Sequence, residues 1–445
     1  MGIVDEATGL GGRDGTTPRP RFAEALAVWA KIGLLSFGGP AGQIALMHRE
    51  IVETRGWVSE ARFLNALNFC MLLPGPEAQQ LATFLGWALH GTRGGIAAGT
   101  LFVLPGFIVI SVLSTLYALF HQTQWLGDVF FGLKAAVVAI VVEALIKLGR
   151  RALKRRLSAV VAVAAFLAMF AFGVPFPLIV VVAGLAGFLA SRRQVDAQEP
   201  PTTAPDEVQR HRPWRIASTW IAVWLAPVAF AAVLFGADST LATLGVFFVK
   251  TALTTFGGAY AVLGYVAQVA VEPLHWLRPE EMLDGLALAE TTPGPLLLVL
   301  SFVGYQAGFH AGAGLNGIAG GVLGAAMVAW VTFVPSFLWI FLGAPYIDRL
   351  NGRTGLDGAL SAITAAVVGV ILNLAVWFAL NTLFTEIGRW HFGPIALALP
   401  RWASLDPAAA TLTVLALACV FRWRLSMLTT LVVIGALGFA ARSFA

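Results

Sequence analysis

Four short sequences rich in glycine and proline interrupt apolar stretches of this chain. They are Phe37-Gly38-Gly39-Pro40, Pro74-Gly75-Pro76, Phe256-Gly257-Gly258 and Pro293-Gly294-Pro295. Proline lacks an amide proton and glycine permits unusual dihedral angles, so a helix should stop and restart at each place. A restarted helix presents unpaired amides and the positive end of its dipole, which favour an anion. The four breaks predict a cradle for an oxyanion; packing kinks are the alternative interpretation.

Polar side chains next to these breaks could complete such a site. An intramembrane charge usually faces a cavity or snorkels to the interface, and arginine offers a planar fork suited to oxyanions. The further candidates for binding are Lys31, Gln43, Arg49, Glu50, Glu77, Gln79, Lys250, Glu290 and Thr291. Three alternatives remain open: the lysines could snorkel to the interface, residues 48–62 could be a solvated amphipathic connector, and Glu290 could cap a helix. The second half carries Val262, Leu296 and Leu298 where the first has Gln43, Glu77 and Gln79, so the first half should supply more of the binding chemistry.

Composition places the chain in a membrane. Of 445 residues, 58% are hydrophobic and 12% are charged, about half the charged share of a soluble protein. The net charge of +5 comes from basic residues in short loops, which indicates topology and no nucleic-acid surface. Cys70 and Cys419 lie in apolar segments, so neither a disulfide framework nor a metal site is expected. No catalytic triad, phosphate loop or cofactor motif appears, so we expect no enzyme and no cofactor.

The apolar stretches predict an all-α polytopic membrane protein with about thirteen transmembrane helices, because a helix needs roughly 20 apolar residues to cross a bilayer. We expect spans at about 22–47, 60–89, 94–120, 129–149, 157–173, 176–190, 214–236, 241–265, 280–308, 314–343, 358–384, 405–421 and 425–443. The polar, proline-containing stretch between the sixth and seventh spans is typical of a linker. Basic residues there and at 147–156 predict that both regions are cytoplasmic, with the N-terminus inside and the C-terminus outside.

An internal repeat relates the two halves. Lys31, the glycine pair, Trp57 and Pro74-Gly75-Pro76 recur 219 positions later, and Ala135-Ala136-Val137-Val138 recurs 230 positions later at Ala365-Ala366-Val367-Val368. The predicted span at 214–236 has no counterpart before the first copy, so the two copies should be inserted in opposite directions. Broken helices of inverted repeats commonly meet near the midplane around a substrate. The expected parts are an N-terminal tail (1–21), a first repeat (22–190), a linker (191–215), an extra helix (216–240) and a second, inverted repeat (241–445).

The motifs resemble those of the chromate ion transporter family. FGGPAGQIALMHREIVETRGWVSEARFLNAL with LLPGPEAQQLATFLGW is similar to its first-half signature, and FGGAYAVLGYVAQVAVEPLHWLRPEEMLDGLALAETTPGP is similar to its second-half version. The resemblance implies a long-chain, two-domain member that exports chromate across the bacterial inner membrane and confers chromate resistance. It also marks Lys31, Phe37, Gly38, Gly39, Pro40, Gln43, Glu50, Trp57, Pro74, Gly75 and Pro76. Ala259 and Ala261 replace Pro40 and Gly42 in the second copy, which puts its role in direct binding in doubt.

The expected mechanism is alternating access, with chromate bound at the broken helices and one half rocking against the other. Transport of sulfate or another oxyanion and a passive anion channel are the alternatives. The sequence leaves open the coupling ion, the preference between chromate and sulfate, and whether the protein forms a homodimer.

Overall fold

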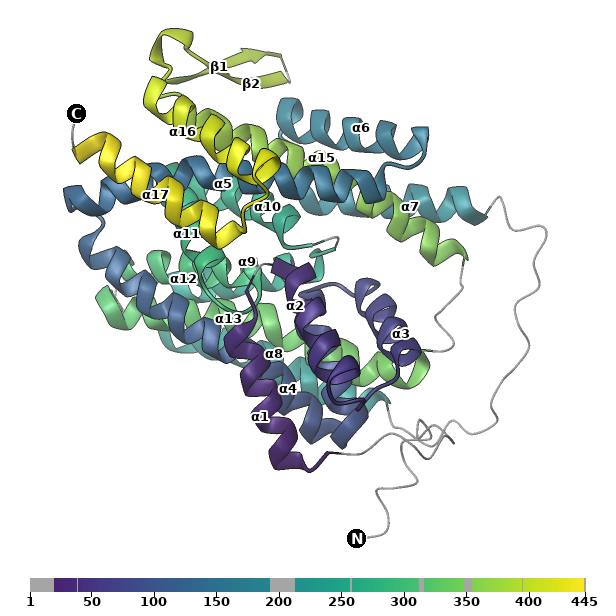
Figure 1. Ribbon diagram of the computed structural model, residues 1–445. Helices are drawn as coiled ribbons and strands as arrows, with labels where there is room; N and C mark the ends of the chain where they lie inside the picture. Colours follow the sequence, from purple (N-terminus) through teal and green to yellow (C-terminus); the bar gives the residue numbers. More distant parts are fainter. Residues whose placement is uncertain are drawn as a thin grey trace, which may run out of the picture.

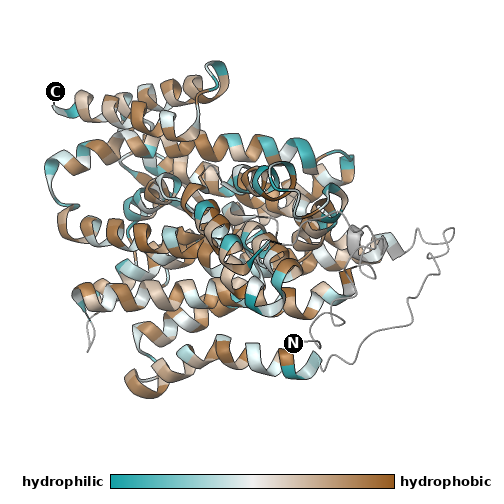
Figure 2. Cartoon of the chain, turned by 60° about the horizontal axis from the view of Figure 1, so that its bottom comes forward, coloured by the Kyte–Doolittle hydropathy of each residue, from teal (hydrophilic) through white to brown (hydrophobic). Residues whose placement is uncertain are grey.

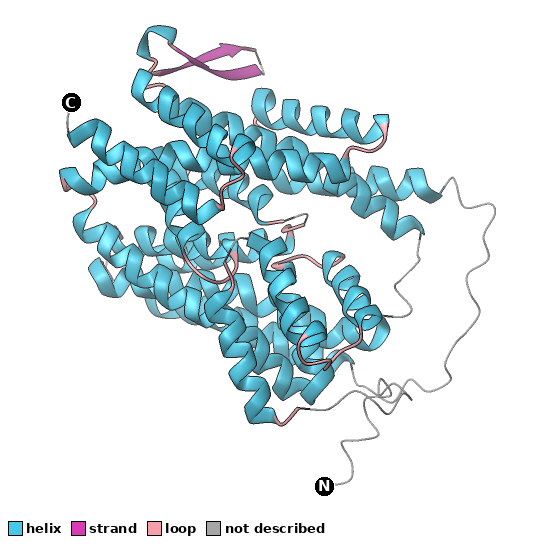
Figure 3. Cartoon of the chain, viewed as in Figure 1, coloured by secondary structure: helices cyan, strands magenta, loops and turns pink. Residues whose placement is uncertain are grey.

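The computed structural model describes residues 20–37, 39–192, 213–256, 258–311, 316–347, 354–393 and 395–443. Within these residues the chain is almost entirely helical, and its one sheet is a two-stranded hairpin (Figure 3). This confirms the predicted all-α class. Gly38 and Gly257, the first 19 residues and residues 193–212 of the predicted linker lie outside the described residues.

The helices of the first half follow the predicted spans and are divided at the predicted breaks. They are α1 (Phe22–Leu35), α2 (Gly39–His48), the π-helical η1 (Arg49–Glu53), α3 (Glu60–Met71), α4 (Glu77–Phe120), α5 (Gln124–Ala152), α6 (Arg156–Phe172) and α7 (Phe176–Arg192). The predicted gap between residues 89 and 94 is a kink inside α4, where Gly91 has a φ of 62°.

The second half contains one additional helix at its start and a β-hairpin that has no counterpart among the described residues of the first half. Its elements are α8 (Pro213–Phe235), α9 (Thr240–Leu253), α10 (Ala259–Val271), α11 (Pro279–Thr291), η2 (Leu296–Leu298), α12 (Val299–Phe309), α13 (Gly317–Gly343), η3 (Ala344–Tyr346), α15 (Thr354–Leu383), β1 (Ile387–Phe392), β2 (Ile395–Pro400), η4 (Trp402–Ser404), α16 (Pro407–Leu417), η5 (Ala418–Arg422) and α17 (Met427–Ser443).

Five of the helices are long and apolar enough to cross a membrane. They are residues 77–120, 124–152, 213–235, 317–343 and 358–383, and several shorter helices are also apolar. Brown, apolar colour dominates the helices in Figure 2, while teal gathers mainly at helix ends and connections. The chain is therefore a multi-pass membrane protein, and the number of thirteen crossings stays a prediction.

Several corresponding helices of the two halves lie in the same layer. Figure 1 shows a lower group with α1, α4, α8, α9, α12 and α13, and an upper group with α5, α6, α7, α15, α16 and α17; α10 and α11 lie between them, and α2 and α3 stand at the front right. By the offsets of the sequence repeat, α1 corresponds to α9 and α5 to α15, so each layer contains elements of both copies.

The last helices of each copy pack on the other copy. Helix α5 of the first half packs against α16 and α17, while α15 of the second half packs against α6 and α7. The two copies are thus intertwined, because removal of either one would leave apolar helix faces of the other uncovered.

Close helix packing and indole hydrogen bonds hold the lower layer together. A Cβ on Gly308 of α12 would lie 2.2 Å from the carbonyl oxygen of Gly320 on α13, so only glycine fits this crossing. The additional helix α8 is attached to α13 by two bonds: Trp224 Nε1 donates to the carbonyl oxygen of Val331, and Trp330 Nε1 donates to that of Val223, both at 2.9 Å.

The β1–β2 hairpin between α15 and α16 is an element that the sequence analysis did not predict. Its strands pair antiparallel, with Arg389 opposite Ala398. Two six-residue runs separated by Gly393-Pro394 were the available signal, and the aromatic residue Trp390 is typical of a strand.

Candidate functional site

The broken helices of the two copies contact each other at reciprocal positions. The amide nitrogen of Gly294 donates to the carbonyl oxygen of Ser36 at 2.8 Å, and the amide nitrogen of Gly75 donates to the carbonyl oxygen of Thr255, also at 2.8 Å. Ser36 corresponds to Thr255 and Gly75 to Gly294 in the sequence repeat. Each Phe-Gly-Gly break therefore accepts a hydrogen bond from the Pro-Gly-Pro break of the other copy.

Local chemistry makes these backbone groups available. The hydroxyl of Ser36 donates to the carbonyl oxygen of Ile32 at 2.6 Å, and that of Thr255 donates to Thr251 at 2.7 Å, so each caps the end of its helix. Gly75 and Gly294 have φ values of 122° and 88°, which side chains rarely adopt. The prolines on both sides have no amide to donate, so the glycine amide is the one that bridges the copies.

Gln43 adds a third bond between the copies. This side chain is buried, and its Nε2 donates to the carbonyl oxygen of Gly294 at 2.6 Å. The predicted substrate donor therefore has a backbone partner in this structure. Its counterpart Val262 cannot make the equivalent bond, so the pseudosymmetry of the junction is broken here.

A cleft of about 1240 Å³ opens beside this junction. We call it the main cleft; its wall comes from the length of α2 and from η1, from the first turn of α10, from α3, from the start of α4, from the C-terminal end of α5 and from α15. Pro40 and Phe256 of the two glycine breaks both line it, together with Gly258. Because α2 and α10 begin here, the positive ends of two helices meet at one cleft.

The charged side chains of the main cleft are mixed, with a basic majority. Arg49, Lys147 and Arg151 line it, opposed by Glu53 and Glu77. Lys147 is paired with Glu143 at 2.6 Å, while Arg49 and Arg151 have no carboxylate within ion-pair distance among the described residues. His48 bridges Glu53 and Glu60, with nitrogen–oxygen distances of 3.1 and 2.6 Å. Two arginines are thus free to contact an anion.

The predicted lysines lie away from the main cleft. Lys31 Nζ donates to Glu50 Oε1 at 2.8 Å, and Arg55 Nη1 donates to Glu50 Oε2 at 2.5 Å. The hydrogen bond from Lys31, together with that from Arg55, lowers the pKa of the Glu50 carboxyl, although burial alone would raise it. Lys250 is exposed, and no described carboxylate pairs with it. Glu50 and the lysines are therefore not brought to the cleft wall.

The Pro-Gly-Pro residues do not line the main cleft, whereas Glu77, which directly follows Pro76, does. Gln79 is buried and donates from Nε2 to the carbonyl oxygen of Phe333 at 3.2 Å, which is a packing role. In the second copy, Pro293 faces Gly106 of α4 so closely that a Cβ there would lie 2.1 Å from the Pro293 oxygen. Pro74, Pro76 and Pro295 likewise flank the glycine bridge and do not line the cleft.

Glu290 reaches the main cleft through a tyrosine. Tyr260 lines the cleft and donates from its hydroxyl to Glu290 Oε1 at 2.7 Å. Thr291 lies instead at a hollow of about 430 Å³ that is lined by α5 and α17. Of these two candidates, only Glu290 is connected to the cleft.

Sequence reasoning missed Lys147, Arg151 and Tyr260 as cleft residues. Lys147 and Arg151 are four residues apart at the end of α5, so they share one helix face. That spacing was the available signal, but which face is turned to α2 depends on packing.

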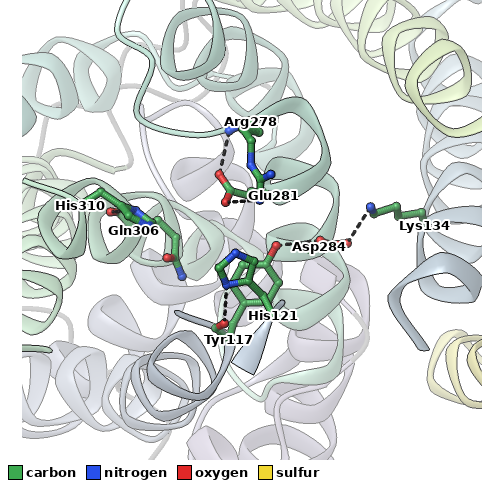
Figure 4. A network of polar contacts seen from close by, with 8 residues as sticks. All are labelled: Tyr117, His121, Lys134, Arg278, Glu281, Asp284, Gln306 and His310. Atoms are coloured by element: carbon green, nitrogen blue, oxygen red, sulfur yellow. Dashed lines mark hydrogen bonds and ion pairs between the residues drawn. The ribbon is translucent and has the colours of Figure 1, made fainter. Parts of the chain in front are cut away.

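A second polar cluster joins the two layers (Figure 4). Tyr117 of α4 donates from its hydroxyl to Asp284 Oδ2 of α11 at 2.8 Å, and Lys134 Nζ of α5 lies 3.6 Å from Asp284 Oδ1. One turn earlier on α11, Glu281 accepts from Arg278 Nη2 at 3.1 Å. Asp284 is buried, so these partners are what offsets its charge.

The fold and this cleft define a multi-pass membrane protein of the transporter class. The family model described as "Chromate transporter" matches residues 23–188 and 242–439, which lie in the two predicted repeats. The chain belongs to the chromate transporter family. No solved structure matches it.

Three curated relatives cover most of the chain. It is similar to the chromate transport protein of Pseudomonas aeruginosa, with 33% identity over 80% of each chain. The chromate transport protein of Cupriavidus metallidurans is 27% identical over 82% of this chain and 84% of its own. The probable chromate transport protein of Synechococcus elongatus is 28% identical over 88% and 93%.

Proposed function

We propose that this protein is a secondary transporter that exports chromate across the bacterial inner membrane by alternating access and thereby confers chromate resistance. The names of the relatives support chromate as the substrate, since the matches span both halves. Bound chromate would be a compact dianion with oxygen acceptors on every side.

The observation that carries the proposal is the chemistry of the main cleft. Arg49 and Arg151 have no described carboxylate partner and line a cleft at which α2 and α10 begin. Guanidinium groups and helix N-termini bind oxyanions by charge-assisted hydrogen bonds, so this wall suits a dianion. Glu53 and Glu77 limit the net positive charge, which helps release because a site of excessive affinity would retain its ligand.

The membrane potential favours export of such an ion. Moving a dianion outward across 100 mV, inside negative, releases about 4.6 kcal/mol. Proton exchange is the other available driving force, and Glu290, which accepts a hydrogen bond from the cleft residue Tyr260, could carry a proton.

The orientation follows from charge and from the repeat. Lys147 and Arg151 belong to the most basic connection of the chain, so we place the main cleft at the cytoplasmic side. The first copy then begins inside and the second outside, with the N-terminus cytoplasmic and the C-terminus periplasmic. The reciprocal bonds of Gly75 and Gly294 support two oppositely inserted copies around one junction. A homodimer is compatible with this arrangement and is not required by it.

Two other functions are separable by experiment. Sulfate has the same charge and shape as chromate, so a sulfate transporter would show strong inhibition of chromate uptake by sulfate. A passive anion channel would show flux that does not saturate, whereas a carrier saturates.

The test is chromate uptake into inverted membrane vesicles, with and without a potential and a proton gradient. We expect saturable uptake driven by an inside-positive potential, inhibited weakly by sulfate, and reduced in the Arg49→Gln variant. Uptake equal to that of vesicles without the protein would refute the proposal. Stimulation by a proton gradient at zero potential would identify proton exchange.

A further inference from the structure

The structure contains a second cavity that corresponds to the main cleft by the sequence repeat. It has a volume of about 190 Å³ and is bounded by α6, α10, α15 and the β1–β2 hairpin. Gln268 and Glu272 of its wall correspond to Arg49 and Glu53 at the offset of 219, and Trp377 corresponds to Lys147 at the offset of 230. Gly264 and Leu374 likewise match the cleft residues Ala45 and Ala144.

The two cavities differ in size and in charge. The main cleft has more than six times the volume of the second cavity. The cationic positions of Arg49 and Lys147 are occupied by the neutral side chains Gln268 and Trp377, and the bulky indole takes up space. The amide oxygen of Gln268 is buried and has no hydrogen-bond partner among the described residues, so it can accept a hydrogen bond from water in this cavity.

The hairpin covers the second cavity. Arg389 of β1 and Ala396, Leu397 and Ala398 of β2 form part of its wall, and Arg389 pairs with Glu272 at the end of α10. The first copy has no such cover, because α5 leads to α6 through only Leu153–Arg155. The Arg389–Glu272 pair is largely exposed to solvent, and exposed ion pairs are weak enough to open and close repeatedly.

We infer that the second cavity is the vestibule through which the anion leaves on the opposite side of the membrane, and that the β1–β2 hairpin is its gate. This inference rests on the proposed carrier function. In a carrier of two inverted copies, the second copy opens by adopting the arrangement that the first copy has here, while the first copy closes. Separation of α10 from the C-terminal half of α15 then enlarges the second cavity as the main cleft is enlarged now.

The charge difference gives the pathway a direction. The main cleft carries Arg49 and Arg151 without a described carboxylate partner, so it captures a dianion at low concentration. In the second cavity the neutral Gln268 replaces Arg49, and the arginine of the wall, Arg389, is paired with Glu272, so the same ion is held less tightly. The anion is therefore bound strongly at the main cleft and weakly at the vestibule, which favours release there.

A reversible cross-link between hairpin and α10 tests the gate. In the Glu272→Cys/Arg389→Cys variant, a cleavable bifunctional thiol reagent should fix the hairpin over the cavity. The native residues Cys70 and Cys419 are buried, and their reaction with the reagent is the same in every variant. We expect chromate transport in proteoliposomes to fall at least tenfold, equilibrium binding of radiolabelled chromate to remain, and transport to return after cleavage and removal of the reductant. The two single-cysteine variants treated with the same reagent are the controls.

Transport by the cross-linked variant at the rate of these controls would overturn the gate. Absence of transport in the untreated wild type would instead refute the carrier function, so the two failures are distinguishable. If the wild type shows no transport, a measurement without substrate still tests the gate. The thiol of the Gln268→Cys variant should react with an impermeant thiol reagent up to about fivefold faster when Glu272→Gln and Arg389→Gln remove the ion pair. A change of about fivefold is what the loss of an exposed ion pair can supply. An unchanged rate would contradict the gate.

Discussion

The side-chain amide of Gln43 donates to the backbone oxygen of Gly294 at 2.6 Å, across 251 positions of sequence. This bond joins the restarted helix α2 of the first copy to the Pro-Gly-Pro break of the second. It lies beside the reciprocal backbone bonds of Gly75 and Gly294, so a side chain joins the backbone groups that connect the two copies.

Replacement of Gln43 by valine, the residue at its counterpart Val262, should weaken this junction. The buried oxygen of Gly294 loses its side-chain partner, which costs about 1–3 kcal/mol. We expect a lower melting temperature in detergent and reduced transport. The Val262→Ala variant is the control for lost packing; a Gln43→Val protein as stable and active as the wild type would show that the bond is dispensable.

Arg49→Gln, which introduces the residue of the corresponding position Gln268, should weaken substrate binding. Loss of a charge-assisted contact worth about 1.4 kcal/mol would raise the KM for chromate about tenfold. The Arg49→Lys variant keeps the charge but not the fork and should lie between the two. An unchanged KM in both variants, measured in vesicles at matched expression, would remove Arg49 from the site; Lys250→Gln, away from the cleft, should leave the KM unaltered.

The Lys31–Glu50–Arg55 cluster should stabilise the protein in a pH-dependent way. The pKa of Glu50 is lowered in the folded protein from an ordinary value of 4.5, so the stabilisation is fully present above pH 4.5 and is lost as the pH falls through the folded pKa. Since Lys31 is half exposed, the effect should be about 1 kcal/mol or less. Melting temperatures should separate wild type from Glu50→Gln at pH 7 and converge in acid. A constant difference down to pH 3 would contradict this.

Lys134→Ala should destabilise the protein strongly. It leaves Asp284 buried with Tyr117 as its remaining side-chain partner, and an uncompensated buried charge costs about 3–5 kcal/mol. The double variant Lys134→Met/Asp284→Asn removes both charges and should recover most of the loss. Equal melting temperatures for Lys134→Ala and wild type would show that the ion pair has no stabilising role.

Gly294→Ala should be tolerated less well than an ordinary helix substitution. The φ of 88° is unfavourable for alanine, at a cost of about 1–2 kcal/mol, and the new Cβ would lie 3.1 Å from Leu298 Cδ1. Gly127→Ala, where nothing lies within 4 Å of the new Cβ, is the matched control. If both variants melt at the same temperature, the positive φ is not required.

The sequence by itself determined the all-α membrane class, the four helix breaks and the correspondence of the two copies. These features depend on local properties, since apolar runs, proline and glycine act within a few residues of their own position. Even the capping by Ser36 and Thr255 involves a partner only four residues away.

Tertiary structure alone decided which residues face the main cleft. Lys31 is bound by Glu50 and does not line the cleft, whereas Lys147 and Arg151 line it because α5 packs against α15 there. The pairing of Gly75 with Thr255 and of Gly294 with Ser36 also required coordinates. Long-range packing chooses the partners of a side chain, and one sequence carries no direct signal of which distant helix will cover a given face.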